Sequence, residues 1–91
     1  MAAGVGSRPR ALVTGAAGGL GREIAVQLAA RGCALAICDI NAEGLTGTAK
    51  LLSEHGAEVE QIASDLTAKG APEAAVDRVV VRWGGIDILV N

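Results

Sequence analysis

The stretch that decides the fold of this chain is Thr14-Gly15-Ala16-Ala17-Gly18-Gly19-Leu20-Gly21. It follows the apolar run 11–13 and opens a segment with helical periodicity. A strand, a glycine-rich turn and a helix in this order are typical of a βαβ unit that binds nucleotides. Gly15 permits a tight exit from the strand, while Gly19 and Gly21 leave room for a pyrophosphate and for helix–sheet packing. The helix N-terminus then offers N–H groups and partial positive charge to phosphates.

Strands and helices alternate along the rest of the chain. We expect strands at 10–14, 34–38, 58–64 and 86–91, and helices from the glycine-rich turn to about residue 31, at 42–55 and at 72–83. Because parallel strands are joined by right-handed crossovers, this order predicts an α/β fold with helices on both faces of the sheet. The expected architecture is a Rossmann-type doubly wound parallel sheet of strand order 3-2-1-4, truncated after its fourth strand. Residues 1–9 are expected to form a disordered leader to this single domain, which spans 1–91.

Apolar stripes on the three helices predict how they pack. The expected stripes are Leu20, Ile24 and Leu28 on the first helix, Leu45, Thr48/Ala49 and Leu52 on the second, and Val76, Val79/Val80 and Trp83 on the third.

Composition excludes several classes of protein. The chain has 91 residues, 51% of them hydrophobic, and a net charge of −2 without a Lys/Arg cluster, which argues against a nucleic-acid partner. No apolar run approaches the roughly 18 residues that a membrane span needs. Cys33 and Cys38 are too few and too close for a disulfide framework or a metal site. We therefore expect a cytoplasmic protein with no metal, membrane or nucleic-acid partner.

Two aspartates follow predicted strands at the edge of the sheet that carries the glycine-rich turn. Asp39 closes the second strand, where an acid can bind both ribose hydroxyls of an adenosine and repel a 2′-phosphate, so NAD is favoured over NADP. Asp65 closes the third strand and could accept a hydrogen bond from the adenine amino group while Leu66 packs on the ring. The alternatives are a solvated strand-end carboxylate for Asp39 and a helix cap for Asp65.

Together these residues resemble the short-chain dehydrogenase/reductase family. The family pattern Thr-Gly-x-x-x-Gly-x-Gly matches residues 14–21, and the two strand-end acids match Asp39 and Asp65. The segment Asp87-Ile88-Leu89-Val90-Asn91 is similar to the start of the family's Asp-x-Leu-Val-Asn-Asn-Ala-Gly segment. The glycines also fit the Thr-Gly-x-x-Gly-x-x-Gly pattern of the extended branch, although the Leu-Val-Asn ending favours the shorter branch.

The resemblance implies hydride transfer between a nicotinamide cofactor and an alcohol or carbonyl. In this family a Tyr-x-x-x-Lys pair and a serine carry the chemistry, and the 91 residues contain no tyrosine. We therefore expect the NAD-binding first third of such an enzyme, inactive alone, whose full-length relatives form homo-oligomers. The candidate cofactor-binding residues are Gly15, Ala17, Gly19, Leu20, Gly21, Asp39, Ile40, Asp65, Leu66 and Asn91, with no catalytic residue among them.

Two other functions are compatible with parts of the pattern. A small non-catalytic module that holds NAD or another adenosine ligand would need the same glycine-rich turn and strand-end acid. A methyltransferase also places an acid at the end of its second strand, but the Thr-Gly opening and the wide glycine spacing disfavour it.

Overall fold

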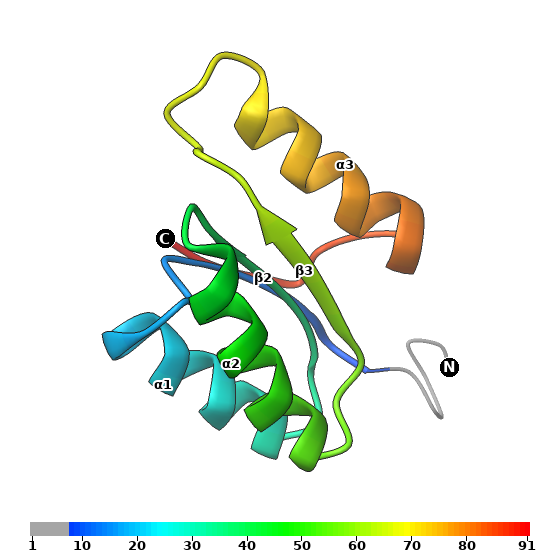
Figure 1. Cartoon of the computed structure of the whole chain (residues 1–91). Helices are drawn as coiled ribbons and strands as arrows, with labels where there is room; N and C mark the ends of the chain where they lie inside the picture. Colours follow the sequence, from blue (N-terminus) through cyan, green and yellow to red (C-terminus); the bar gives the residue numbers. More distant parts are fainter. Residues whose placement is uncertain (1–7) are drawn as a thin grey trace.

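Four parallel strands in the order β3-β2-β1-β4 form the centre of the molecule (Figure 1). The computed structural model describes residues 8–91. The strands are β1 (Arg10–Thr14), β2 (Ala34–Asp39), β3 (Val59–Ala63) and β4 (Ile88–Val90), and the helices are α1 (Gly19–Ala30), α2 (Ala42–Glu54) and α3 (Ala71–Trp83). The predicted α/β fold and strand order are therefore confirmed.

The predicted leader falls only partly on the described residues. Residues 1–7 lie outside them. The carbonyl oxygen of Pro9 accepts a hydrogen bond of 2.8 Å from the backbone N–H of Ala34. Pairing between the first two strands thus begins one residue before β1.

The sheet separates two helical layers. Helices α1 and α2 cover one face, and α3 lies on the other (Figure 1). β1 and β2 are central, with Leu12 opposite Ala36 on one side and opposite Leu89 on the other. Residues 34–38 of β2 are all buried, which explains why this strand is continuously apolar.

Each layer has its own hydrophobic cluster. The cluster under α1 and α2 includes Val13, Leu35, Ile37, Leu45 and Leu52. The cluster under α3 is smaller and consists of Leu12, Ala36, Cys38, Ile62, Ala75 and Val79, with Trp83 and Ile86 half-buried beside it. The two faces of the same strands therefore contribute to different cores.

The stripe expected on α2 is confirmed, because Leu45, Thr48, Ala49 and Leu52 are the buried residues of that helix. The stripe expected on α1 is confirmed only at Leu28, which packs against the cluster under α1 and α2. Ala25 and Ala29 are buried instead, whereas Leu20 is 75% exposed. These alanines continue the line of Gly21 at four-residue spacing, and small side chains let the helix approach the sheet closely.

The stripe expected on α3 is confirmed in part, at Val79 and at Trp83, which packs beside the cluster under α3. Ala75 and Val79 are buried, while Val76 and Val80 are exposed.

Two strands are shorter than expected. β4 begins at Ile88 because residues 84–87 form the connection from α3, in which the N–H of Asp87 donates to the carbonyl of Arg10 at 2.8 Å.

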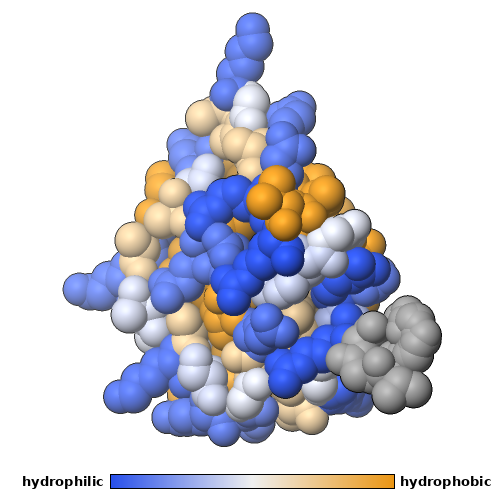
Figure 2. Space-filling view, turned by 90° about the vertical axis from the view of Figure 1, so that its right-hand side faces the viewer, coloured by the Kyte–Doolittle hydropathy of each residue, from blue (hydrophilic) through white to orange (hydrophobic). Residues whose placement is uncertain are grey.

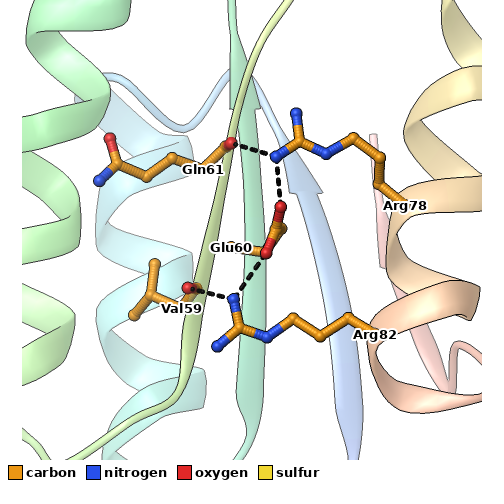
Figure 3. A network of polar contacts seen from close by, with 5 residues as sticks. All are labelled: Val59, Glu60, Gln61, Arg78 and Arg82. Carbon is orange, nitrogen blue, oxygen red and sulfur yellow. Dashed lines mark hydrogen bonds and ion pairs between the residues drawn. The ribbon is translucent and has the colours of Figure 1, made fainter.

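The edge strand β3 is covered by side chains of α3 (Figure 3). Arg82 Nη1 donates to the carbonyl of Val59 at 3.0 Å, and Arg78 Nη2 donates to that of Gln61 at 3.3 Å. Both arginines also form ion pairs with Glu60. The distance between Arg82 Nη1 and Glu60 Oε1 is 2.6 Å. Since the carbonyl of residue 58 faces β2, those of 59 and 61 point to the open edge. The arginines thus occupy acceptors that an added strand would use.

The surface seen from the right of Figure 1 is mostly polar. Figure 2 shows hydrophilic residues over much of this face, with hydrophobic residues in small separate groups. Among residues 8–91, no helix combines the length and the apolar character needed to cross a membrane.

Candidate nucleotide-binding site

The carboxyl ends of β1, β2 and β3 bring the predicted site residues to one edge of the sheet. An open depression between the glycine-rich turn and the ends of β2 and β3 is lined by five of them: Gly15, Asp39, Ile40, Asp65 and Leu66. Cys38 and Ser64 complete the lining. Ligands of open α/β sheets bind at this edge, at the point where the strand order reverses.

The glycine-rich turn depends on glycine for two different reasons. Gly15 and Gly19 have left-handed backbone conformations, with φ of 65° and 55°, which side chains disfavour. Gly21 is required by close packing, because a Cβ there would lie 2.1 Å from the carbonyl oxygen of Gly15. A Cβ at Gly19 would meet nothing within 4 Å, so the space in front of that residue is open to a ligand.

The N-terminus of α1 presents backbone N–H groups to this open space. Its N-cap residue is Gly18, which supplies no side-chain acceptor, and the first turn contains no acidic residue. The first N–H groups of a helix lack partners within the helix. An anion such as a phosphate group would satisfy them and interact favourably with the helix dipole.

Asp39 joins the end of β2 to the glycine-rich turn. Its Oδ2 accepts a hydrogen bond from the backbone N–H of Ala17 at 3.0 Å, and its Oδ1 accepts one from that of Asn41 at 3.0 Å. These bonds, the one from Asn41 first, hold the pKa of the Asp39 carboxyl below its ordinary value. The group is therefore ionised at neutral pH, and each oxygen keeps acceptor capacity for a ligand hydroxyl.

Asp65 does not cap the following helix. The N-cap of α3 is Gly70, whereas Asp65 Oδ1 accepts from the backbone N–H of Thr67 at 2.9 Å and from its hydroxyl at 2.6 Å. The bond from the Thr67 hydroxyl is the main reason that the pKa of Asp65 is lowered. Both bonds use Oδ1, so Oδ2 is left to face the depression or solvent as an acceptor.

Thr14 connects the start of the glycine-rich turn to the end of β4. Its hydroxyl lies 3.1 Å from Asn91 Oδ1 and 3.3 Å from the carbonyl oxygen of Val90. One hydroxyl proton serves these two acceptors. Asn91 is thereby placed beside the exit of β1, next to the turn.

Comparison with known proteins agrees with this geometry. The model of the short chain dehydrogenase family matches residues 9–91. The chain belongs to this family. It is 38% identical over 81 residues to 1-deoxy-11-beta-hydroxypentalenate dehydrogenase of Streptomyces avermitilis. The aligned residues make up 89% of this chain and 30% of that protein. It is 42% identical over 81 residues to D-threitol dehydrogenase of Mycolicibacterium smegmatis, covering 89% of the chain and 31% of that protein.

Solved structures of short-chain dehydrogenases superpose well on the chain. NAD⁺-bound xylitol dehydrogenase has a TM-score of 0.86 and 38% identity, over 89% of this chain and 31% of that one. A variant of actinorhodin polyketide ketoreductase with NADPH has a TM-score of 0.86 and 42% identity, over 92% of this chain and 32% of that one. The chain thus spans about a third of the length of the relatives it matches.

Two apolar residues are exposed at the site of this short-chain dehydrogenase sequence. Leu20, in the first turn of α1, is 75% exposed, and Ile40, directly after Asp39, is 71% exposed. Ile40 lines the depression and is available to pack on a ligand, whereas Leu20 follows Gly19 at the N-terminus of α1 and lies outside that lining. Leu20 therefore stays a prediction from the sequence.

Sequence reasoning missed three residues that hold the site together. Asn41 is the N-cap of α2, where its Oδ1 accepts from the N–H of Gly44 at 3.0 Å. Its position just before a helical pattern is a detectable signal. Arg22 and Thr48 hold the glycine-rich turn through contacts between α1 and α2. No local pattern reveals those contacts.

Proposed function

We propose that this chain is the NAD-binding portion of an oxidoreductase that interconverts an alcohol and a carbonyl compound. Family membership supports the reaction class. The observation that carries the cofactor assignment is the carboxylate of Asp39, held at the end of β2 by the N–H groups of Ala17 and Asn41. When bound, the dinucleotide accepts or delivers the hydride.

The residues at the carboxyl ends of the strands have complementary roles in this proposal. The turn around Gly19 and the N-terminus of α1 bind the pyrophosphate, where the backbone is open and N–H groups are available. Asp39 accepts hydrogen bonds from the adenosine ribose. Asp65 and Leu66 contact the adenine, for which Oδ2 of Asp65 is the available acceptor. Ile40 and Leu20 pack on the ligand, and Asn91 and Thr14 hold the edge of the turn.

A preference for NAD over NADP follows from charge. The lowered pKa of Asp39 keeps a negative charge where a 2′-phosphate would lie. The two residues after it, Ile40 and Asn41, carry no positive charge. The guanidinium group of Arg22 is engaged with the carbonyls of Ala17 and Gly44. Since relatives of known structure include an NAD⁺-bound and an NADPH-bound protein, the preference is proposed from these side chains alone.

The proposal is tested by titrating the protein with NADH and NADPH and following nicotinamide fluorescence. Asp39→Ser should weaken NADH binding by about tenfold or more, the worth of hydrogen bonds to a charged group, while NADPH binding falls less or improves. Asp39→Asn is the matched control that removes charge and keeps the size of the side chain. Equal losses for both dinucleotides in Asp39→Ser would remove Asp39 from the ribose site.

The alternative of a non-catalytic NAD-binding module predicts the same binding results. It differs in turnover, because only the oxidoreductase reduces NAD⁺ when alcohols are supplied. A screen of alcohols with the protein as its native source produces it separates the two functions. Binding without turnover would favour the module.

A further inference from the structure

The side chain of Arg22 crosses from α1 to the N-terminal part of α2. Its Nη2 donates to the carbonyl oxygen of Ala17 at 2.8 Å and to that of Gly44 at 3.0 Å. Its Nε donates to the hydroxyl of Thr48 at 2.8 Å. One guanidinium group therefore binds the glycine-rich turn and two positions of α2 at once.

Thr48 extends this contact to a second carbonyl of the turn. Its hydroxyl donates to the carbonyl oxygen of Ala16 at 2.7 Å and accepts the hydrogen bond from Arg22. Thr48 is fully buried, the only buried polar side chain of the core among residues 8–91. A buried hydroxyl without these partners would be costly, so the network fixes both groups in one arrangement.

The absence of a side chain at Gly44 brings α2 against the turn. A Cβ at this position would lie 2.8 Å from both the Cβ and the carbonyl oxygen of Ala17. Contacts this short would force the two segments apart. Direct backbone packing therefore adds to the hydrogen bonds of Arg22 and Thr48.

The result is that the peptide groups around Ala17 are held from both sides. Its N–H donates to Asp39 and its carbonyl accepts from Arg22. The preceding residue, Ala16, donates its N–H to the carbonyl of Cys38 at 3.1 Å, and its carbonyl accepts the hydrogen bond of the Thr48 hydroxyl. The segment that leads into the N-terminus of α1 is thus fixed between β2 and α2.

We propose that Arg22 is a positioning residue for dinucleotide binding, acting through the carbonyl of Ala17 and through Thr48 to hold the glycine-rich turn in the conformation that receives the pyrophosphate. This inference rests on the proposed function. Arg22 does not touch the ligand. Ala17 is hydrogen-bonded both to Arg22 and to the carboxylate of Asp39. Arg22 therefore keeps the N–H groups of the turn in a fixed position relative to that carboxylate.

The geometry requires arginine rather than any cation. The planar guanidinium group presents several donors in a fixed arrangement, whereas lysine carries a single ammonium on a flexible stem. Three acceptors on two elements are reached by Nε and Nη2 of Arg22. A lysine would reach only part of this set.

The test compares Arg22→Ala and Arg22→Lys with Val26→Ala. Val26 lies four residues further along the same helix, packs on the core and makes none of the hydrogen bonds to the turn, so Val26→Ala reports simple loss of helix packing. NADH affinity is measured by fluorescence, at a temperature well below each variant's Tm. Hydrogen exchange of the Ala17 amide is measured by NMR without ligand.

Arg22→Ala should weaken NADH binding by about tenfold or more and accelerate exchange of the Ala17 amide. Arg22→Lys should fall between Arg22→Ala and the parent protein in both measurements. Val26→Ala should lower Tm and leave both unchanged. If Arg22→Ala fails to fold, Thr48→Val serves, since it replaces the hydroxyl with a methyl group of similar size and should give the same two effects to a smaller extent.

Unchanged NADH affinity and Ala17 exchange in Arg22→Ala would overturn the proposal. So would equal effects of Arg22→Ala and Val26→Ala at equal loss of Tm. Failure of the parent protein to bind NADH would instead contradict the proposed function. The exchange of Ala17 would then still show whether Arg22 fixes the turn.

Discussion

Replacing Gly21 with alanine should damage both stability and cofactor binding. The new Cβ would lie 2.1 Å from the carbonyl oxygen of Gly15, 2.7 Å from its carbonyl carbon and 3.2 Å from the Cα of Ala16. Since Cβ contacts below 3.0 Å are essentially never found, the first distance must grow from 2.1 Å to at least 3.0 Å. All three obstructing atoms belong to the backbone, so α1 or the turn itself has to move.

Overpacking of this kind costs about 1–3 kcal/mol of the free energy of unfolding. For a domain of this size, each kcal/mol lowers Tm by about 4–8 °C. The same displacement moves the N-terminus of α1 relative to Asp39, and a misplacement near 1 Å can reduce a site's function by about two orders of magnitude. We therefore expect Gly21→Ala to unfold several degrees earlier and to lose most of its NADH affinity.

The assay is thermal and urea unfolding followed by circular dichroism, with NADH titration below Tm. Gly18→Ala is the matched control in the same turn, because a Cβ there meets nothing within 4 Å and the backbone is extended, with φ −176°. It should cost no more than about 1 kcal/mol, the preference for glycine over alanine at an N-cap, because no packing conflict is added. A Gly21→Ala protein as stable as Gly18→Ala would show that the close contact between Gly21 and Gly15 does not limit stability.

Two further predictions concern ion pairs that join the elements. The hydrogen bonds from Arg10 lower the pKa of Asp87 from 3.8 to about 2, so the stability they give is present above pH 3.8 and is lost as pH falls toward 2. The difference in Tm between the parent and Asp87→Asn should therefore shrink over that range, and a constant difference would exclude this role. Along the edge of β3, the double variant Arg78→Ala/Arg82→Ala should free the two edge carbonyls and raise the pKa of Glu60, which both arginines lower. Sedimentation velocity should show self-association of that variant, and a monomer at all concentrations would count against a protective role.

The parts of the fold that sequence could predict are those encoded locally. The glycine-rich turn follows from residues 14–21, and buried parallel strands are recognisable because β2 is continuously apolar. The strand-end positions of Asp39 and Asp65 then follow from the topology, since parallel strands end at the same edge. These features hardly depend on how closely the helices approach the sheet.

The buried face of each helix was harder to predict from the sequence, because it depends on how closely the helix approaches the sheet. Periodicity favours Leu20 and Val76 as inward residues, but Ala25 and Ala75 are the ones that pack against the sheet. Small residues carry a weak hydrophobic signal and still determine close packing. A stripe of larger apolar residues beside these alanines is therefore easily mistaken for the face of the helix that packs against the sheet.

The contacts of Arg22 could not be predicted for a related reason. They join α1 to α2 across 22 and 26 residues of sequence, to Gly44 and Thr48. An arginine in a helix is ordinarily expected to be solvated. Only the three-dimensional approach of the two helices shows that it is hydrogen-bonded to the turn.

NMR titration of the protein with NAD⁺ shows whether the glycine-rich turn and Asp39 bind the dinucleotide. We expect shifts of the backbone amide signals of Gly15, Ala17, Gly19 and Asp39, with smaller shifts at Asp65. A second depression, on the outer side of α1 at Glu23, Gln27 and Arg31, serves as an internal control and should not respond. Shifts confined to that outer side, or no shifts at millimolar NAD⁺, would show that this site does not bind NAD.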